Sequence, residues 1–96
     1  RGVVDLYDAS TDWIPIYDRS SLPGFYMAVG TSGNQFKNAP VAGVMMAELI
    51  TACEAGQDHD REPVQMTYRY TGRNADIGFF SRNRDVNPNS SFTVLG

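Results

Sequence analysis

The fold is decided by a strand–loop–helix pattern over residues 25–55, which read FYMAVGTSGNQFKNAPVAGVMMAELITACEA. Residues 25–30 are almost continuously apolar, which is typical of a strand covered on both faces. A small polar loop with glycines at Gly30 and Gly33 follows, and a helical pattern begins after it. Backbone N–H groups of the loop and the positive end of the helix would meet at one point, which favours an anionic ligand.

One long helix is expected from Ala39 to Ala55. Asn38 is a suitable N-cap, and Pro40 falls in the first turn, where its missing N–H costs nothing. Gly56 is a suitable residue for ending the helix. Because apolar residues lie on nearly every side, we expect this helix to be buried on most of its faces.

By itself the glycine loop is a weak signal for ligand binding. It matches neither the Gly-x-Gly-x-x-Gly pattern of dinucleotide-binding folds nor the Lys-Ser/Thr phosphate loop. Many such glycines only allow the chain to turn tightly. From the residues alone, an anion site and a simple turn both remain open.

The flanking sequence predicts short elements on either side of this pattern. Pro15 cannot donate to a β-ladder, so a strand that contains it must lie at a sheet edge or against something other than a strand. The pattern as a whole predicts an α+β fold with short strands, one long buried helix and an extended C-terminal tail. The flanking elements are strands over 3–7, 13–17 and 64–70, an apolar piece at 77–80, and a polar arm over 81–96.

Length and composition exclude several classes of protein. The 96 residues make one domain at most, and we expect them to be a piece of a longer protein. No apolar run approaches the ~18 residues of a membrane span, and a net charge of −3 argues against a nucleic-acid partner. One cysteine and one histidine exclude an internal disulfide and a multi-cysteine or histidine-rich metal site. We therefore expect a cytoplasmic protein with no metal, no nucleic acid and no membrane partner.

Charge is distributed unevenly along the chain. Residues 1–60 carry three basic and eight acidic residues, whereas residues 61–96 carry five basic and three acidic ones. The sign changes in a polar stretch that follows Gly56, which indicates a loop. We therefore divide the chain into 1–62 and a C-terminal extension, 63–96. The widely spaced arginines of the extension are more typical of a solvated or inter-domain face than of a nucleic-acid site.

Four stretches form a recognisable series: LYD at 6–8, TDWIPI at 11–16, PGFYMAVGTSGNQFK at 23–37, and a helix over 39–50 that begins APVAG and ends AELI. In this order and at nearly this spacing, they resemble the C-terminal part of the flavin amine oxidoreductases. This group includes D-amino-acid oxidase, glycine oxidase, sarcosine oxidase and dimethylglycine dehydrogenase. Members commonly carry T-P-D-x-x-P-I-I-G and then G-L-Y-x-A-x-G-x-S-G-H-G-F-K-x-A-P. The resemblance covers about residues 4–52.

This resemblance implies an α+β fragment of an FAD-binding α/β oxidoreductase, with the dinucleotide-binding motif upstream of the given residues. In the family, the glycine loop directs backbone N–H groups at the pyrimidine edge of the flavin. Reduction leaves negative charge there, near N1 and the C2 carbonyl, and such donors stabilise it. The cofactor-binding residues that the resemblance implies are Gly30, Thr31, Ser32, Gly33, Asn34, Gln35 and Phe36.

Lys37 is the only lysine, and it aligns with the lysine that binds the substrate carboxylate in sarcosine oxidase-like members. An ammonium at this point would hold an amino acid with its C–H bond directed at flavin N5. The competing interpretation is a surface lysine, although a cation at a helix start is mildly unfavourable. Asn34 and Gln35 replace the usual His-Gly pair of the family. Asp5 and Leu6 stand where some sarcosine oxidases carry the cysteine that links FAD, so non-covalent FAD is expected.

The resemblance further implies that the full-length protein oxidises the C–N bond of an amino acid or of a secondary or tertiary amine to an imine. Its partners would be that small substrate and the remainder of the FAD-binding domain, and a homo-oligomer is also compatible. The 96 residues alone are expected to be inactive, and none is assigned as catalytic. Two alternatives stay open: a small non-enzymatic α+β module that binds an anion or a partner, and one subunit of a split flavoenzyme.

Five other residues have competing structural and functional interpretations. Asp12 is expected to cap a turn rather than to transfer a proton. Trp13 and Tyr17 would either line the substrate side or pack in the core. Cys53 is expected to be a small buried apolar residue rather than a reactive thiol. His59 lies in a charged loop, and we expect it to be exposed and without function.

Overall fold

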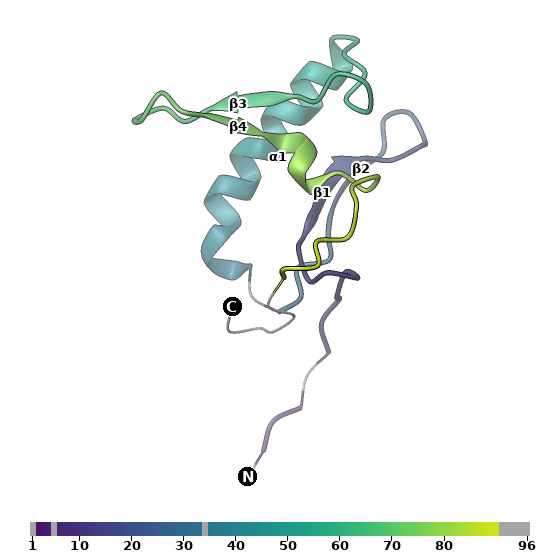
Figure 1. Ribbon diagram of the computed structural model, residues 1–96, viewed down its shortest axis with the longest axis vertical. Helices are drawn as coiled ribbons and strands as arrows, with labels where there is room; N and C mark the ends of the chain where they lie inside the picture. The colour runs from purple at the N-terminus through teal and green to yellow at the C-terminus, as the bar shows by residue number, and fades with distance from the viewer. Residues whose placement is uncertain (1, 5, 34, 91–96) are drawn as a thin grey trace.

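The computed structural model describes residues 2–4, 6–33 and 35–90. Within them the chain forms two antiparallel two-stranded sheets, one α-helix and two short 3₁₀ helices, which confirms an α+β fold. Figure 1 shows the helix beside the β1–β2 sheet, with the β3–β4 hairpin crossing over it. In chain order the elements are β1 (Ile16–Arg19), β2 (Tyr26–Val29), η1 (Phe36–Asn38), α1 (Ala39–Glu54), β3 (Gln65–Thr67), β4 (Asn74–Asp76) and η2 (Ile77–Phe80).

The first sheet is a hairpin in which Ile16 pairs with Val29 and Arg19 pairs with Tyr26. The strand expected over 13–17 is therefore shifted, because it begins only at Ile16. Pro15 lies directly before the ladder, where its missing N–H removes no ladder hydrogen bond.

Two expectations about strands are wrong. No strand forms over the described residues of 3–7; an isolated bridge joins Ala9 to Thr31, and the side chain of Val3 is almost fully exposed. An apolar run without a neighbouring strand gains no ladder hydrogen bonds. Likewise β2 is not covered on both faces, because Val29 at its end is largely exposed and α1 packs mainly against β1.

The helix α1 forms almost where it was expected. Pro40 lies in its first turn, and Gly56, with φ of 102°, follows its end. Asn38 occupies the N-cap position, but its side chain does not cap the helix. It donates instead to Oε1 of Gln35 at 2.8 Å. The reason is that η1 gives Asn38 φ of −95° and ψ of 1°, whereas a capping side chain needs extended backbone.

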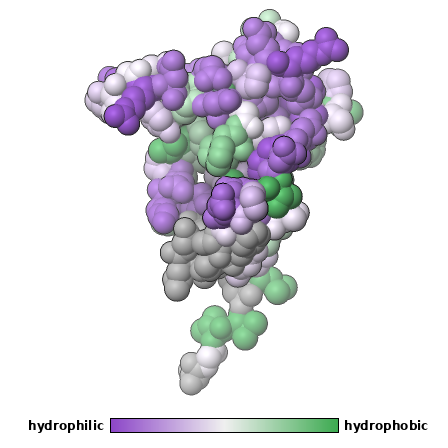
Figure 2. Space-filling model, viewed as in Figure 1, coloured by the Kyte–Doolittle hydropathy of each residue, from purple (hydrophilic) through white to green (hydrophobic). Residues whose placement is uncertain are grey.

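The expectation that α1 is buried on most faces is also wrong for the described residues. Met45 and Leu49 are buried, whereas Val41, Val44 and Ile50 are exposed. The sheet and the β3–β4 hairpin cover one side of the helix, and two small sheets of this size cannot surround it. Figure 2 shows hydrophilic residues over the β3–β4 hairpin and hydrophobic ones standing out along the N-terminal segment.

The second sheet follows the predicted alternation in a shorter strand. In β3 the side chain of Met66 is buried while Gln65 and Thr67 are exposed, and Gln65 pairs with Asp76 of β4. The apolar piece at 77–80 forms η2, which begins where the N–H of Gly78 donates to the Asp76 carboxylate at 2.8 Å.

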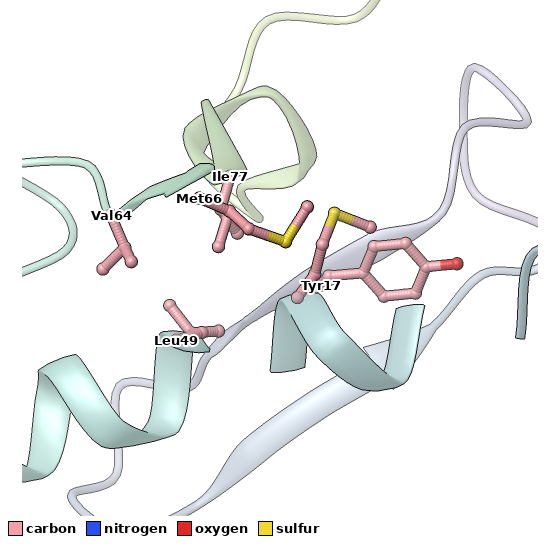
Figure 3. Packing of buried hydrophobic residues seen from close by; sticks show 6 residues of the cluster. Tyr17, Leu49, Val64, Met66 and Ile77 are labelled. Atoms are coloured by element: carbon pink, nitrogen blue, oxygen red, sulfur yellow. The ribbon is translucent and has the colours of Figure 1, made fainter. Parts of the chain in front are cut away.

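The hydrophobic core joins residues from both sides of the 62/63 division. Figure 3 shows side chains of the segment after that division facing Leu49 of α1, with Tyr17 of β1 beside them. Residues 81–90 lie along β1 and the segment before it, where Arg82 binds Asp18 and Arg84 binds Ile14, as an arm that gains order on a surface of the same chain. Residues 92–95, the apolar end of this arm, lie outside the described residues. The buried core residues are Tyr17, Met45, Leu49, Val64, Met66 and Ile77.

Candidate functional site

The first half of the glycine loop is organised by Asp8. The N–H of Gly30 and the hydroxyl of Thr31 donate to the Asp8 carboxylate, the latter at 2.9 Å, and the N–H of Ser32 donates to the Asp8 carbonyl at 2.8 Å. The hydrogen bond from Thr31, followed by that from the N–H of Gly30, lowers the pKa of Asp8. The donors at Gly30 and Ser32 are thus used within the chain, where they shape the loop.

Backbone conformation explains the residue types at the start of this loop. Gly30 has φ of 71°, and a Cβ at this position would lie 3.2 Å from Cβ of Ser10. Ser32 is fully buried with φ of 55°, and its hydroxyl donates to the carbonyl of Gly30 at 3.2 Å. Gly33 continues the turn with φ of 78°. The loop is therefore a defined turn that lies between the end of β2 and η1.

The start of α1 follows this turn through η1, and the N–H of its first residue, Ala39, donates to the carbonyl of Phe36. Its first turn contains no acidic residue, and no side chain at the N-cap position binds its N–H groups. A hollow of about 440 Å³ lies here, between β2, the loop and the helix start. The side chains and backbone that surround it include those of Ala28, Gly33, Ala39 and Ala42, which are small enough for a flat ligand to approach the backbone.

The structure brings together some of the predicted site residues and separates others. Thr31, Gly33, Gln35 and Phe36 line the hollow, whereas Lys37 is exposed on η1 and does not line it. Asn34 lies outside the described residues. The predicted loop is therefore assembled at the helix start, without the lysine in its wall.

The interpretation of Asp12 as a turn-capping residue is confirmed, and the structure adds further partners. The N–H of Ile14 donates to its carboxylate at 3.1 Å, as expected for a cap. Arg84 donates to the same carboxylate at 2.6 Å, and the N–H of Asn87 does so at 3.1 Å. Burial by itself raises the pKa of Asp12, but the hydrogen bonds from Asn87, Arg84 and Ile14 outweigh it and lower the pKa to about 2.

Cys53 packs against the core, and burial raises the pKa of its thiol. A raised pKa leaves little thiolate at neutral pH, which agrees with a small apolar residue rather than a nucleophile.

The expectation that His59 is exposed and idle is wrong. Its side chain is fully buried; Nδ1 accepts a hydrogen bond from the N–H of Val64 at 2.9 Å, and Nε2 lies 3.8 Å from Oδ1 of Asp18. Since Nδ1 is an acceptor, the proton of the neutral ring is assigned to Nε2, facing that carboxylate. The flanking charges suggested exposure, but the loop folds over β1 and turns this one side chain inward.

Asp18 is the buried residue that the sequence analysis missed. One of its oxygens accepts from the N–H of Arg19 at 2.7 Å, and the other accepts from the N–H and the guanidinium of Arg82, both at 2.9 Å. Arg82 also binds Asp60 through two hydrogen bonds of 3.0 Å, and this pairing lowers the pKa of Asp60. A signal was present in the arginines of the C-terminal extension, each of which needs a counter-charge when it packs against the chain.

Within the described residues, no group of three or more His, Cys, Asp or Glu side chains is arranged to hold a metal ion. The same part of the chain contains no helix with the length and apolar character needed to cross a bilayer.

The hollow at the start of α1 thus remains the candidate site. Compared with known proteins, the chain matches no family model, no curated protein and no solved structure.

Proposed function

We propose that this chain is the C-terminal part of an FAD-dependent oxidoreductase that oxidises the C–N bond of an amino acid or a secondary or tertiary amine to an imine. The observation that supports the proposal is the hollow at the junction of β2, the glycine loop and α1. It lies where the resemblance to the flavin amine oxidoreductases puts the flavin edge. The substrate would be a small amine or amino acid.

The residues around the hollow fit the edge of a flat, anionic ring. The main-chain N–H groups of Gly33 and Phe36, which lie just before the first turn of α1, are the donors that we assign to it. No carboxylate in that turn opposes negative charge, and the positive end of the helix favours it. When bound, FAD supplies the acceptor for the hydride equivalent that leaves the substrate. The role of the chain is to hold this edge and to stabilise its charge.

Lys37 is proposed to bind the substrate carboxylate, as the resemblance implies. It lies on η1, directly between Phe36 of the hollow and the start of α1. Its exposure leaves the ammonium accessible to a substrate.

The exposed apolar residues near the hollow support a larger assembly. Phe36, Val29, Val41 and Val44 are all exposed, and an apolar surface of this kind is usually covered by more protein. The remainder of the FAD-binding domain is the cover that we propose. A partner subunit of a split flavoenzyme is the alternative that the same surface favours.

The test uses the protein encoded by the complete reading frame that contains these residues. We expect it to purify with bound flavin, visible by absorbance, and to show reduction of that flavin when amines or amino acids are added without oxygen. The 96-residue chain alone should retain no FAD. A complete protein without flavin and without amine oxidation would overturn the proposal, as would tight FAD binding by the 96 residues alone.

A matched pair of variants tests the site itself. Ala39→Glu puts a carboxylate in the first turn of α1 beside the hollow, where it repels a reduced flavin but does not weaken the helix. Ala47→Glu puts the same group on an exposed position in the middle of α1. We expect the flavin content to fall by about tenfold or more in the first variant only, which corresponds to about 1.4 kcal/mol. An equal flavin content in both variants would contradict the site.

A further inference from the structure

A second cavity adjoins the flavin site that we propose, and Tyr17 and Gln35 line both of them. Its volume is about 520 Å³, within the range of about 300–1,000 Å³ that small-molecule sites occupy. Its walls come from the segment before β1 with Tyr17 of β1, from Gln35 and Asn38, from α1, from the β3–β4 hairpin with η2, and from residues 89 and 90. Five separate parts of the chain thus converge on one space.

Aromatic rings form a continuous series from the floor of this cavity to its mouth. The ring of Tyr17, which is 4% exposed, lies 5.1 Å from that of Phe80, and the ring of Phe79 stands edge-on to Phe80 at 5.0 Å. Phe79 and Tyr68, which are 55% and 41% exposed, lie at the mouth. The aromatic ring of a ligand can therefore pack against aromatic side chains both at the floor and at the mouth of the cavity.

The described residues that line the cavity carry no charged side chain. Its polar groups are neutral, and among them are the amides of Asn38 and Asn89. The Asn38 amide is held in place by its hydrogen bond to Gln35, 2.8 Å long. A charged ligand would lose its hydration here without meeting an opposite charge, which is costly. A neutral ligand meets no such cost and can use the amides for its polar atoms.

Trp13, which also lines the cavity, has a strained backbone. Its φ is 62°, a value that bulky residues rarely adopt. The neighbouring contacts hold it there: its N–H donates to Ser10 at 3.2 Å, Asp12 binds the N–H of Ile14, and Arg84 binds the Ile14 carbonyl at 2.9 Å. Strain of this kind persists where the surroundings enforce it, and it is concentrated at ligand sites.

From these observations we propose that the 520 Å³ cavity binds a neutral small molecule that contains an aromatic ring. The ring packs among Tyr17, Phe79 and Trp13, and the amides at the rim bind its polar substituents. This inference goes beyond the proposed oxidation, because it requires neither flavin nor Lys37.

Trp13 is the only tryptophan, so its fluorescence reports on the cavity directly. The 96-residue chain is titrated with three probes of similar size: benzyl alcohol, benzoate and benzylamine. We expect saturable binding of benzyl alcohol and affinities at least about tenfold lower for the two charged probes. Equal affinity for all three, or no saturation with benzyl alcohol, would overturn the proposal.

Two valines on α1 provide matched variants. Val41, 43% exposed, lines the cavity, whereas Val44, 54% exposed, does not. Val41→Phe should fill the cavity and weaken benzyl alcohol binding about tenfold or more, while Val44→Phe should leave it unchanged. Equal effects of the two substitutions would overturn the site.

A further variant and a shortened chain complete the test. Tyr68→Leu removes a ring at the mouth without disturbing the core, and it should weaken binding by about threefold or more even if Val41→Phe fails to fold. A chain that ends at Ser90 should bind benzyl alcohol as the full chain does. Binding only after this truncation would assign the cavity to residues 91–96 and overturn the proposal of an external ligand.

Discussion

Asp12 is a buried carboxylate that stays charged because its neighbours donate to it. Its pKa in the folded chain is about 2, below the ordinary value of 3.8. A carboxyl group with a lowered folded-state pKa stabilises the fold at any pH above its unfolded-state pKa. This contribution disappears as the pH falls through the folded-state pKa. The stabilisation from Asp12 is therefore complete at neutral pH and is lost between about pH 4 and pH 2.

The substitution Asp12→Asn tests this linkage. We expect it to lower the free energy of unfolding by about 2 kcal/mol at neutral pH, measured by urea denaturation, and by much less near pH 2. Asp85→Asn changes an exposed carboxylate of the same arm and should have little effect at either pH. A loss for Asp12→Asn that does not depend on pH would contradict the role of its charge.

Elements whose signals are local were predictable from the sequence. The end of α1 follows from Gly56, and β3 follows from the alternation around Met66. Elements that depend on a distant neighbour were not predictable: residues 3–7 have the composition of a strand but form none over their described part, and β2 lacks a cover on one side. A strand is stable only when its backbone groups find a partner, and composition does not reveal whether one is present.

Two glycines, one in a crowded position and one in an open position, test how closely the elements pack. A Cβ at Gly78 in η2 would lie 2.8 Å from Oδ1 of Asp76 and 2.9 Å from Cβ of Pro63, whereas a Cβ at Gly43 in α1 would meet nothing within 4 Å. Gly78→Ala should destabilise the chain by about 1–3 kcal/mol through overpacking. Gly43→Ala should stabilise it by about 0.5–1 kcal/mol through helix propensity. Urea unfolding midpoints that shift in the same direction would contradict this account.

For the whole molecule, the sequence indicated the position of the glycine loop but not the buried charges. The loop was visible because glycine and proline mark turns and helix starts directly. The cluster of Asp18, His59, Asp60 and Arg82 was not visible, because its members come from β1, from the loop after α1 and from the segment after η2. The burial of Asp18 and His59 follows from tertiary packing, which places opposite charges together only after the chain has folded.

This cluster ties the three segments into one unit, so the final prediction concerns global stability. Arg82→Ala removes the guanidinium that binds Asp18, whose buried carboxylate then loses its counter-charge. We expect a loss of about 3–5 kcal/mol in the free energy of unfolding. Arg61→Ala removes a 90% exposed arginine that lies 3.8 Å from Asp58, and it should cost less than about 1 kcal/mol.

In the double variant Asp18→Asn/Arg82→Ala, the loss should be smaller than the sum of the two single losses, because no unpaired buried charge remains. Additive losses in urea denaturation would show that the two residues stabilise the fold independently.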